Sequence, residues 1–191
     1  MISRAFVLYG ASGDGKTRAC MSVVEWARSR GLSVTGVLGL RVVENGDLIG
    51  YDILDVTSGQ RFAIARLRET SNDSDRFVFG KLIYTFSTIG FQRANEILTC
   101  SAENMDCRTL VFIDEFGRLE KNGLGLYPGA IKVADKLTEG GVAVFTCRTD
   151  LVEVVEKLLK GRARSVSRYA ASEVDTLRAE VTQLFDHSSE L

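Results

Sequence analysis

The sequence contains a single histidine and a single proline among its 191 residues. The histidine, His187, lies in a polar C-terminal tail, so neither a histidine-based metal site nor a histidine-dependent catalytic triad can be assembled. Four cysteines are present, but Cys20, Cys100, Cys107 and Cys147 show no C-x-x-C spacing. We therefore expect reduced cysteines that serve as packing residues in a cytoplasmic protein.

Long apolar runs and an excess of charge of either sign are also lacking. The chain has no uninterrupted apolar run near the roughly 18 residues that span a membrane, and its N-terminus enters a strand pattern without signal-peptide features. The formal net charge is −1, from 24 basic and 25 acidic residues, so no general attraction to nucleic acid is expected. One basic cluster is interpreted as a solvated face: Lys160, Arg162, Arg164 and Arg168. We expect neither a membrane nor nucleic acid as a partner.

Strand and helix patterns alternate along most of the chain. The predicted strands of the main sheet cover residues 5–9, 33–40, 110–113, 142–147 and 165–169, with amphipathic helices between or after them. This alternation is typical of an α/β domain with a mainly parallel sheet. At 191 residues, of which 45% are hydrophobic, the chain favours one domain spanning 1–191.

A second pattern interrupts this alternation. Asn45-Gly46 is a strong hairpin signal between two strand-like segments, and a further turn at Ser58-Gly59 leads into another at residues 61–66. Residues 37–66 are therefore predicted to form an inserted antiparallel β-meander. The polar, aperiodic residues 67–76 are interpreted as a mobile loop.

An eight-residue glycine-rich motif follows the first predicted strand. It matches G-x-x-x-x-G-K-[ST] in the strand–turn–helix context of a phosphate-binding P-loop. Glycines permit positive φ, and the backbone N–H groups of the loop and helix start surround phosphate oxygens. Lys16 is expected to reach the β- and γ-phosphates, and Thr17 to bind Mg²⁺. The predicted nucleotide-binding residues are Gly10, Ala11, Ser12, Gly13, Asp14, Gly15, Lys16, Thr17 and Arg18, with Asp14 exposed to solvent.

The apolar strand 110–113 ends in an acidic pair, Asp114-Glu115. This is the Walker B pattern, and ligands of open α/β sheets bind at the edge where such strands end. Asp114 is expected to hold Mg²⁺ through water, opposite Thr17, while Glu115 orients or deprotonates an attacking water. A carboxylate directly after the Mg²⁺ aspartate suggests the class of P-loop proteins with an additional strand between these two motifs. The predicted strand order is 5-1-4-3-2 in a three-layer P-loop nucleoside-triphosphatase fold with a five-stranded sheet.

The stretch Asp114-Glu115-Phe116-Gly117-Arg118-Leu119-Glu120 resembles the D-E-[apolar]-G-x-[Met/Leu]-E signature of small P-loop nucleoside-triphosphatases. That family was first described from thermophiles, and its vertebrate member is called cancer-related nucleoside-triphosphatase. The resemblance covers nearly the whole chain, although only this stretch and the P-loop are specific. It implies slow, Mg²⁺-dependent hydrolysis of ATP, GTP and other nucleoside triphosphates to diphosphate and phosphate, with little base preference.

The chain departs from that family at two places. Where the family has Glu-Val-Arg, this chain has Arg41-Val42-Val43, so its arginine is displaced by two residues. Near the C-terminus, an Asn-Arg-Asp of the family pattern is replaced by residues 169–172, Tyr-Ala-Ala-Ser. These differences are typical of a divergent member of the family, or of a member of a sister group with altered activity.

Several smaller roles stay open. Arg118 either contacts the γ-phosphate or pairs with Glu120. Arg148, directly after the strand at 142–147, is a candidate sensor of the γ-phosphate and thus a nucleotide-binding residue. The glycine-rich loop at 120–129 either closes over the nucleotide or serves as a flexible connector.

Two other functions fit the same motifs. A nucleotide or small-molecule kinase would transfer the phosphoryl group to an acceptor in place of water. A nucleotide-dependent switch would instead couple triphosphate binding to a protein partner, which can supply a missing arginine and thereby speed a slow turnover.

Overall fold

A nine-stranded sheet runs through the whole molecule in the computed structural model, which describes residues 2–68 and 74–186. In chain order the strands are β1 (Ser3–Tyr9), β2 (Ser33–Glu44), β3 (Asp47–Asp55), β4 (Arg61–Leu67), β5 (Arg76–Val78), β6 (Tyr84–Ser87), β7 (Thr109–Phe116), β8 (Gly141–Cys147) and β9 (Ser165–Ala170). The helices are α1 (Lys16–Ser29), α2 (Thr88–Glu103), α3 (Arg118–Lys121), α4 (Tyr127–Lys136), α5 (Val152–Leu159) and α6 (Val174–Asp186). Short 3₁₀ turns precede α5 and α6. The central part of the predicted 67–76 loop, and His187, lie outside the described residues.

The five parallel strands stand in the order β9-β1-β8-β7-β2. Numbered by their own sequence order, this is 5-1-4-3-2, so the predicted order is confirmed. The strand β8 lies between β1, which leads into the glycine-rich loop, and β7, which carries the acidic pair. The two motifs therefore meet at the same carboxyl edge of the sheet.

The predicted five-stranded sheet with an inserted meander differs from the structure in its extent, because both belong to one nine-stranded sheet. The meander continues the same sheet beyond β2 through β3, β4, β6 and β5, all antiparallel to their neighbours. The first arm is one continuous strand, β2, with a bulge between Val42 and Val43 in its pairing with β3. Two short strands, β5 and β6, were not predicted.

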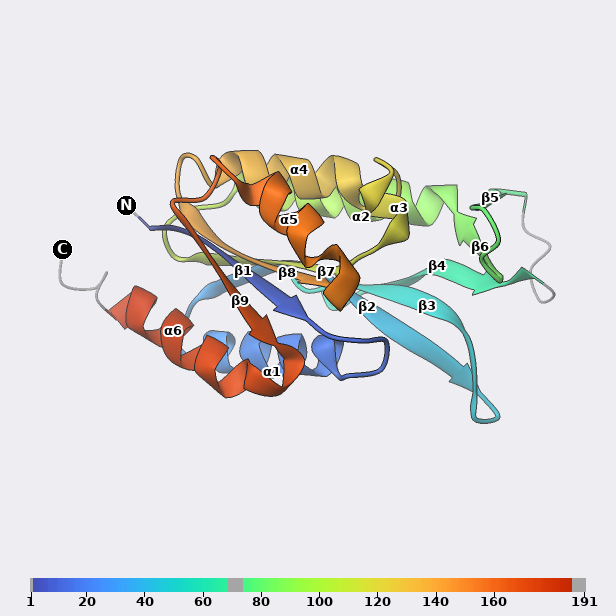
Figure 1. Cartoon of the computed structure of the whole chain (residues 1–191), viewed down its shortest axis with the longest axis horizontal. Coiled ribbons are helices and arrows are strands. Elements are labelled where there is room, and N and C mark those ends of the chain that lie inside the picture. The colour runs from blue at the N-terminus through green and yellow to red at the C-terminus, as the bar shows by residue number, and fades with distance from the viewer. Residues whose placement is uncertain (1, 69–73, 187–191) are drawn as a thin grey trace.

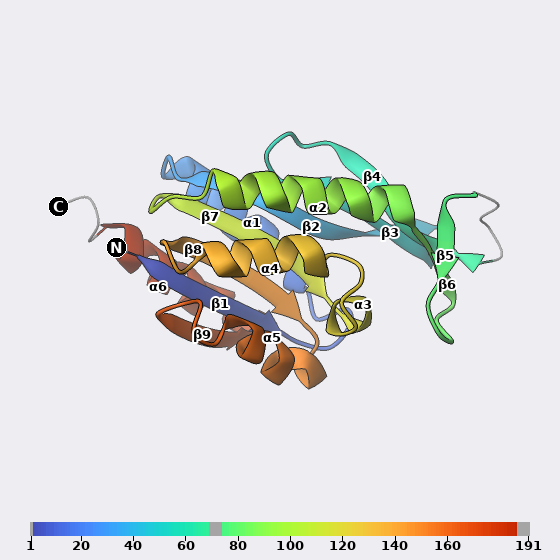
Figure 2. The same cartoon turned by 90° about the horizontal axis from the view of Figure 1, so that it is seen from above.

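Helices cover both faces of the parallel part of the sheet. The helices α2, α4 and α5 lie on one face, and α1 and α6 lie on the other (Figures 1 and 2). Alternate residues of β1 divide between the two resulting cores: Ala5 and Val7 pack on the α2/α4/α5 side, while Phe6 and Leu8 pack on the α1/α6 side. A strand buried on both faces needs such a continuous apolar run. No helix within 2–68 and 74–186 has the length and apolarity that crossing a membrane requires.

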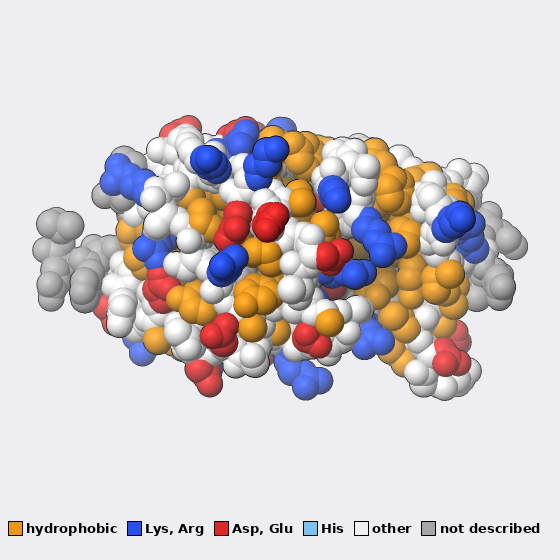
Figure 3. All heavy atoms as spheres, in the orientation of Figure 1, with side chains coloured by type: hydrophobic (Ala, Val, Ile, Leu, Met, Phe, Trp, Pro, Cys, Tyr) orange, Lys and Arg blue, Asp and Glu red, His pale blue; other side chains and the backbone are white. Residues whose placement is uncertain are grey.

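Two of the cysteines and the basic cluster lie as predicted from the sequence, whereas Cys100 and Cys107 are exposed and not packed in the core. All four cysteines are free, with Cys20 and Cys147 buried. In the basic cluster, Arg162 forms an ion pair with Asp135, with its Nε 2.5 Å from a carboxylate oxygen. Charged side chains of both signs are interspersed on the face seen in Figure 3, and apolar side chains gather toward the end formed by the antiparallel extension.

Candidate active site

The glycine-rich loop connects the end of β1 to the start of α1. Gly10 N–H donates to the Cys147 carbonyl of the neighbouring β8 at 3.3 Å, which anchors the start of the loop. Gly13 and Gly15 have φ values of 93° and 86°, in the region that residues with a Cβ avoid. The α1 helix then begins at Lys16, so its first free N–H groups face the loop. The backbone thus has the curvature of a phosphate cradle.

Side chains of the loop stabilise this curvature. The carboxylate of Asp14, which is exposed as expected, accepts the Ala11 N–H at 2.6 Å. Lys16 is buried, with 6% of its surface exposed, and its ammonium donates to the carbonyls of Gly10 (3.1 Å) and Ala11 (2.8 Å). When a phosphate binds, the Lys16 ammonium is placed to donate its hydrogen bonds to the phosphate oxygens in place of these carbonyls.

Thr17 and Asp114 are 97 residues apart in the chain and in direct contact in the fold. The Thr17 hydroxyl donates to Asp114 Oδ2 at 2.6 Å. Asp114 is fully buried, and its other oxygen, Oδ1, accepts the hydroxyl of Thr146 on β8. The two residues predicted to flank a metal ion are therefore brought together at the end of β7, directly below the glycine-rich loop.

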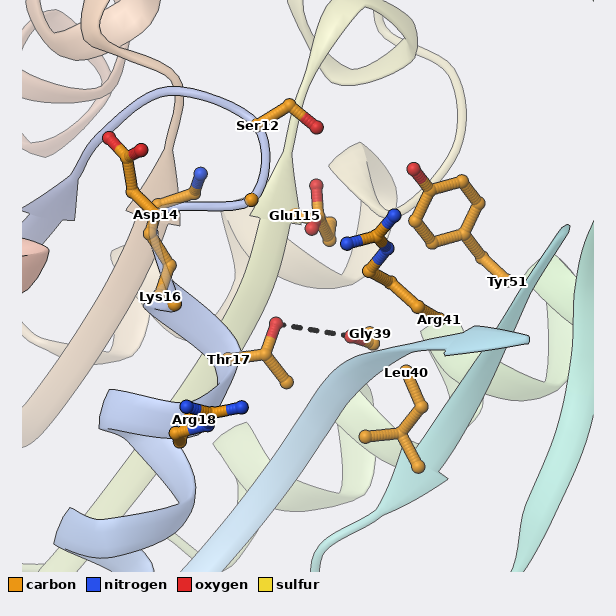
Figure 4. Close-up of a pocket in the computed structure, with 12 residues that line it drawn as sticks. Ser12, Asp14, Lys16, Thr17, Arg18, Gly39, Leu40, Arg41, Tyr51 and Glu115 are labelled. Atoms are coloured by element: carbon orange, nitrogen blue, oxygen red, sulfur yellow. Dashed lines mark hydrogen bonds between the residues drawn. The ribbon is translucent and has the colours of Figure 1, made fainter. Parts of the chain in front are cut away.

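Glu115 has a strained backbone. Its φ of 71° is uncommon for a residue with a side chain. It lies in a bulge, because the pairing of β7 with β8 shifts register between Ile113 and Phe116. Its N–H donates to Thr146 Oγ1 at 2.9 Å, and its side chain lines the pocket in front of the loop (Figure 4). Bulges and strain of this kind cluster at functional sites, where they re-aim a side chain.

The two adjacent carboxyl groups differ in environment. Burial raises the pKa of Asp114, and the hydrogen bonds that it accepts oppose this shift. Removal from bulk solvent, together with the negative charge of Asp114, raises the pKa of Glu115 to about 7. A carboxylate with a pKa near neutrality is suited to accept a proton during a reaction.

Gly39 on β2 is a site residue that the sequence reasoning missed. Its N–H donates to Asp114 Oδ2 at 3.0 Å, and its carbonyl accepts the Thr17 hydroxyl at 3.1 Å. A Cβ at this position would lie 2.6 Å from Glu115 Cγ. Only glycine leaves room for the carboxylate to point into the pocket.

Replacing Gly39 with alanine is expected to lower turnover by about 100-fold, because a misplacement of about 1 Å is enough for such a loss. The added Cβ displaces the Glu115 side chain but leaves both backbone hydrogen bonds of residue 39 intact. Phosphate release measures the loss, and binding of a fluorescent nucleotide, expected within about threefold of wild type, is the control. Wild-type turnover in this variant would mean that the position of Glu115 does not matter.

A pocket of about 410 Å³ opens between the glycine-rich loop and the meander (Figure 4). The loop forms one wall, and Gly39, Leu40, Arg41 and Tyr51 form the other, with Glu115 between them. Arg18 also lines this pocket. Although it is displaced relative to the family pattern, Arg41 thus still lies on the wall that faces the loop.

Arg148 lies at the end of β8 and lines an adjoining pocket with Ala11, Ser12, Thr149 and Asp150. Its Nε is 3.0 Å from a carboxylate oxygen of Asp150. The arginine therefore borders the loop, as a sensor of bound nucleotide must, and its role stays a prediction.

The loop after β7 is attached through Glu120, which is buried with 4% exposed surface. Its two carboxylate oxygens accept the N–H groups of Gly117 and Leu126, each at 2.8 Å. Among the described residues it forms no ion pair with Arg118, so that alternative is not realised. Asn95 of α2 also bonds the Gly125 carbonyl at 2.8 Å. The 120–129 loop is thus held at several points along its length.

These features define a class. The site has a glycine loop between β1 and α1 and an Asp-Glu pair on β7, and one strand, β8, lies between β1 and β7. This arrangement is that of a P-loop nucleoside-triphosphatase of the additional-strand type. A family model described as NTPase matches residues 5–181, and the chain belongs to this nucleoside-triphosphatase family.

Individual relatives agree with this assignment. The chain is 28% identical to the nucleoside-triphosphatase THEP1 of Methanopyrus kandleri over 132 residues, which is 69% of this chain and 68% of that protein. Identity is also 28% to THEP1 of Pyrobaculum calidifontis, over 149 residues, or 78% and 76% of the two chains.

Two solved structures have a similar fold. The solution structure of a human cancer-related nucleoside triphosphatase matches with a TM-score of 0.68 at 20% identity, over 97% of this chain and 98% of that one. The crystal structure of THEP1 from Aquifex aeolicus matches with a TM-score of 0.67 at 19% identity, over 93% and 96%. The resemblance expected from the sequence is confirmed.

Proposed function

We propose that this protein hydrolyses ATP, GTP and other nucleoside triphosphates to diphosphate and phosphate with the help of Mg²⁺. The observation that carries the proposal is the contact between Thr17 and Asp114 below the glycine-rich loop, with the Glu115 carboxylate beside it. A phosphate cradle, a base and Thr17 then line one pocket, and Asp114 reaches it through its contact with Thr17.

Each residue has a role in this scheme. The backbone N–H groups of the loop bind the phosphate oxygens, and Lys16 neutralises the charge that develops as the terminal phosphoryl group leaves. Glu115 holds a water molecule for attack on the γ-phosphorus and accepts its proton. Arg41, which lines this pocket, and Arg148, which lines the adjoining one, are candidates for further charge stabilisation.

The donors at the Thr17–Asp114 pair fit Mg²⁺. This ion prefers oxygen ligands and is usually bound through one or two carboxylates together with substrate phosphates. Asp114 is a fully buried carboxylate whose pKa is raised by burial, so a nearby divalent cation would stabilise its charged form. We infer that Thr17 binds the ion through its hydroxyl and Asp114 through water. When bound, Mg²⁺ would neutralise charge on the β- and γ-phosphates.

A phosphate-release assay with ATP, GTP, CTP and UTP tests the proposal. We expect release with all four, with rates within about tenfold of one another, because the P-loop, Lys16 and Glu115 act on the phosphates and not on the base. Chelation with EDTA is expected to stop release, and excess Mg²⁺ to restore it. Absence of release from every nucleotide in the presence of Mg²⁺ would refute the proposal.

A further inference from the structure

A second cavity, of about 280 Å³, opens directly from the nucleotide pocket. The two share Ser12, Lys16, Gly39, Tyr51 and Glu115. Since Lys16 and Glu115 mark the position of the terminal phosphate in the proposed function, the cavity begins where the triphosphate ends.

The walls of this cavity are mostly apolar, unlike those of the phosphate cradle. They come from β4, the segment before β6, β6 itself, α2 and the loop before α4, and include Ile64, Leu82, Tyr84, Phe86, Phe91 and Leu126. Phe86 and Phe91 pack at a centroid distance of 6.2 Å, and Tyr51 packs edge-on against Tyr84 at 5.5 Å. Apolar walls with a few polar groups at one end are typical of a site for a small organic molecule.

Charged groups also line the cavity, and two of them, Lys16 and Glu115, are shared with the nucleotide pocket. Glu115, Arg118 and Arg148 line it together with Lys16. The carboxylate of Glu120 also borders it, but both of its oxygens already accept backbone N–H groups. A bound molecule therefore meets a reactive carboxylate at its polar end and aromatic rings along its body.

We propose that this cavity binds an alcohol with an apolar or aromatic body, and that the site transfers the terminal phosphoryl group of a nucleoside triphosphate to its hydroxyl. The inference rests on the proposed function, because it uses the same triphosphate, Lys16 and Glu115. It adds a second substrate and a second product, a phosphate monoester.

The transfer is balanced without any further reactant. The hydroxyl oxygen of the alcohol forms a bond to the γ-phosphorus, and the bond from that phosphorus to the β–γ bridging oxygen breaks. The nucleoside diphosphate leaves with the electron pair, and the Glu115 carboxylate takes the hydroxyl proton. Lys16 stabilises the charge on the transferred group. The hydroxyl of the alcohol takes the place of the water molecule at Glu115, because the aromatic walls hold the apolar body of the alcohol.

Incubation of the full chain with Mg²⁺, ATP labelled at the γ-phosphate, and single alcohols tests the proposal. The probes are 2-phenylethanol, benzyl alcohol, 1-hexanol and 1-octanol, with glycerol as a polar alcohol that cannot fill the cavity. We expect a labelled phosphate ester from at least one apolar alcohol, at about ten times the glycerol level or more. Chromatography separates the ester from inorganic phosphate.

The outcomes separate the two proposals. Inorganic phosphate without any ester overturns the acceptor site and leaves hydrolysis standing. Neither product overturns both. Equal ester from glycerol and from the apolar alcohols also overturns the site, because the apolar walls then select nothing.

A matched pair of variants locates the alcohol. Leu82 lines the cavity, whereas the adjacent Ile83 does not and is 62% exposed. Leu82→Trp is expected to fill the cavity, to lower ester formation by about tenfold or more, and to leave alcohol-free phosphate release within about twofold. Ile83→Trp should change neither ester formation nor alcohol-free phosphate release. Unchanged ester formation in Leu82→Trp, with a melting temperature like that of wild type, would overturn the assignment.

Discussion

Replacing Glu115 with glutamine is expected to lower the rate constant of phosphate release by about 10²- to 10⁴-fold, the range typical of a lost general base. An amide is nearly the same size as the carboxylate but cannot accept the proton of the attacking water. The hydrogen bonds that shape the bulge involve the Glu115 N–H and the Thr146 hydroxyl, not the Glu115 side chain. Nucleotide binding is therefore expected to stay within about threefold of wild type.

Single-turnover phosphate release and titration with a fluorescent nucleotide measure the two effects separately. Glu103→Gln, an exposed position at the end of α2, is the matched control and should behave like wild type. Full activity of the Glu115→Gln variant would contradict the mechanism. A loss of binding as large as the loss of turnover would contradict it too, since Glu115 would then be needed to hold the nucleotide.

The central parallel strands could be located in the sequence because each of them is an apolar run. Residues 110–113 are fully buried on β7, and alternate residues of β1 serve two separate cores. The position of the additional strand followed from a single carboxylate, Glu115, which marks a class of P-loop proteins. The confirmed order shows that a local sequence motif can predict how strands far apart in the sequence pair in the sheet.

The antiparallel extension was harder to predict because its strands are short and marginal. β5 has three residues, none of them fully buried, and β6 has four, of which two are buried. Their aromatic side chains, such as Phe77 and Phe86, pack against each other across the sheet. Periodicity needs more residues than this to distinguish a strand from a loop. Tertiary packing thus decides the structure here.

The motifs of the site could be predicted from the sequence, but the residues that support them could not. The glycine loop, Thr17 and Asp114-Glu115 each follow a local pattern, and the fold brings them together. Gly39 and Thr146 are single residues on other strands whose roles arise only from the pairing of β2 and β8 with β7. Two glycines within one strand, Gly36 and Gly39, were the available signal of close backbone approach. At Gly36, a Cβ would lie 2.1 Å from the Phe112 carbonyl oxygen.

Replacing Lys16 with alanine is expected to have the broadest effect, because it removes both binding and transition-state stabilisation. The ammonium is the buried cation of the pocket, and it is already desolvated against two loop carbonyls. A charge held in a water-poor site interacts more strongly with phosphate than an exposed one. We expect turnover to fall by at least about 10²- to 10³-fold, the loss typical of one such electrostatic contact, and nucleotide affinity to fall as well.

Lys16→Ala also frees the carbonyls of Gly10 and Ala11, so the loop could rearrange for structural reasons alone. Lys16→Arg keeps the charge and the donors but changes their geometry, and Lys132→Ala removes an exposed lysine of α4. If charge at the γ-phosphate is what matters, the arginine variant should recover part of the affinity but little of the turnover, because a planar guanidinium does not replace a point charge. Lys132→Ala should match wild type in both. Equal turnover in Lys16→Ala and wild type would show that the P-loop lysine has no part in the mechanism. The reason for placing the terminal phosphate beside Glu115 would then be lost as well.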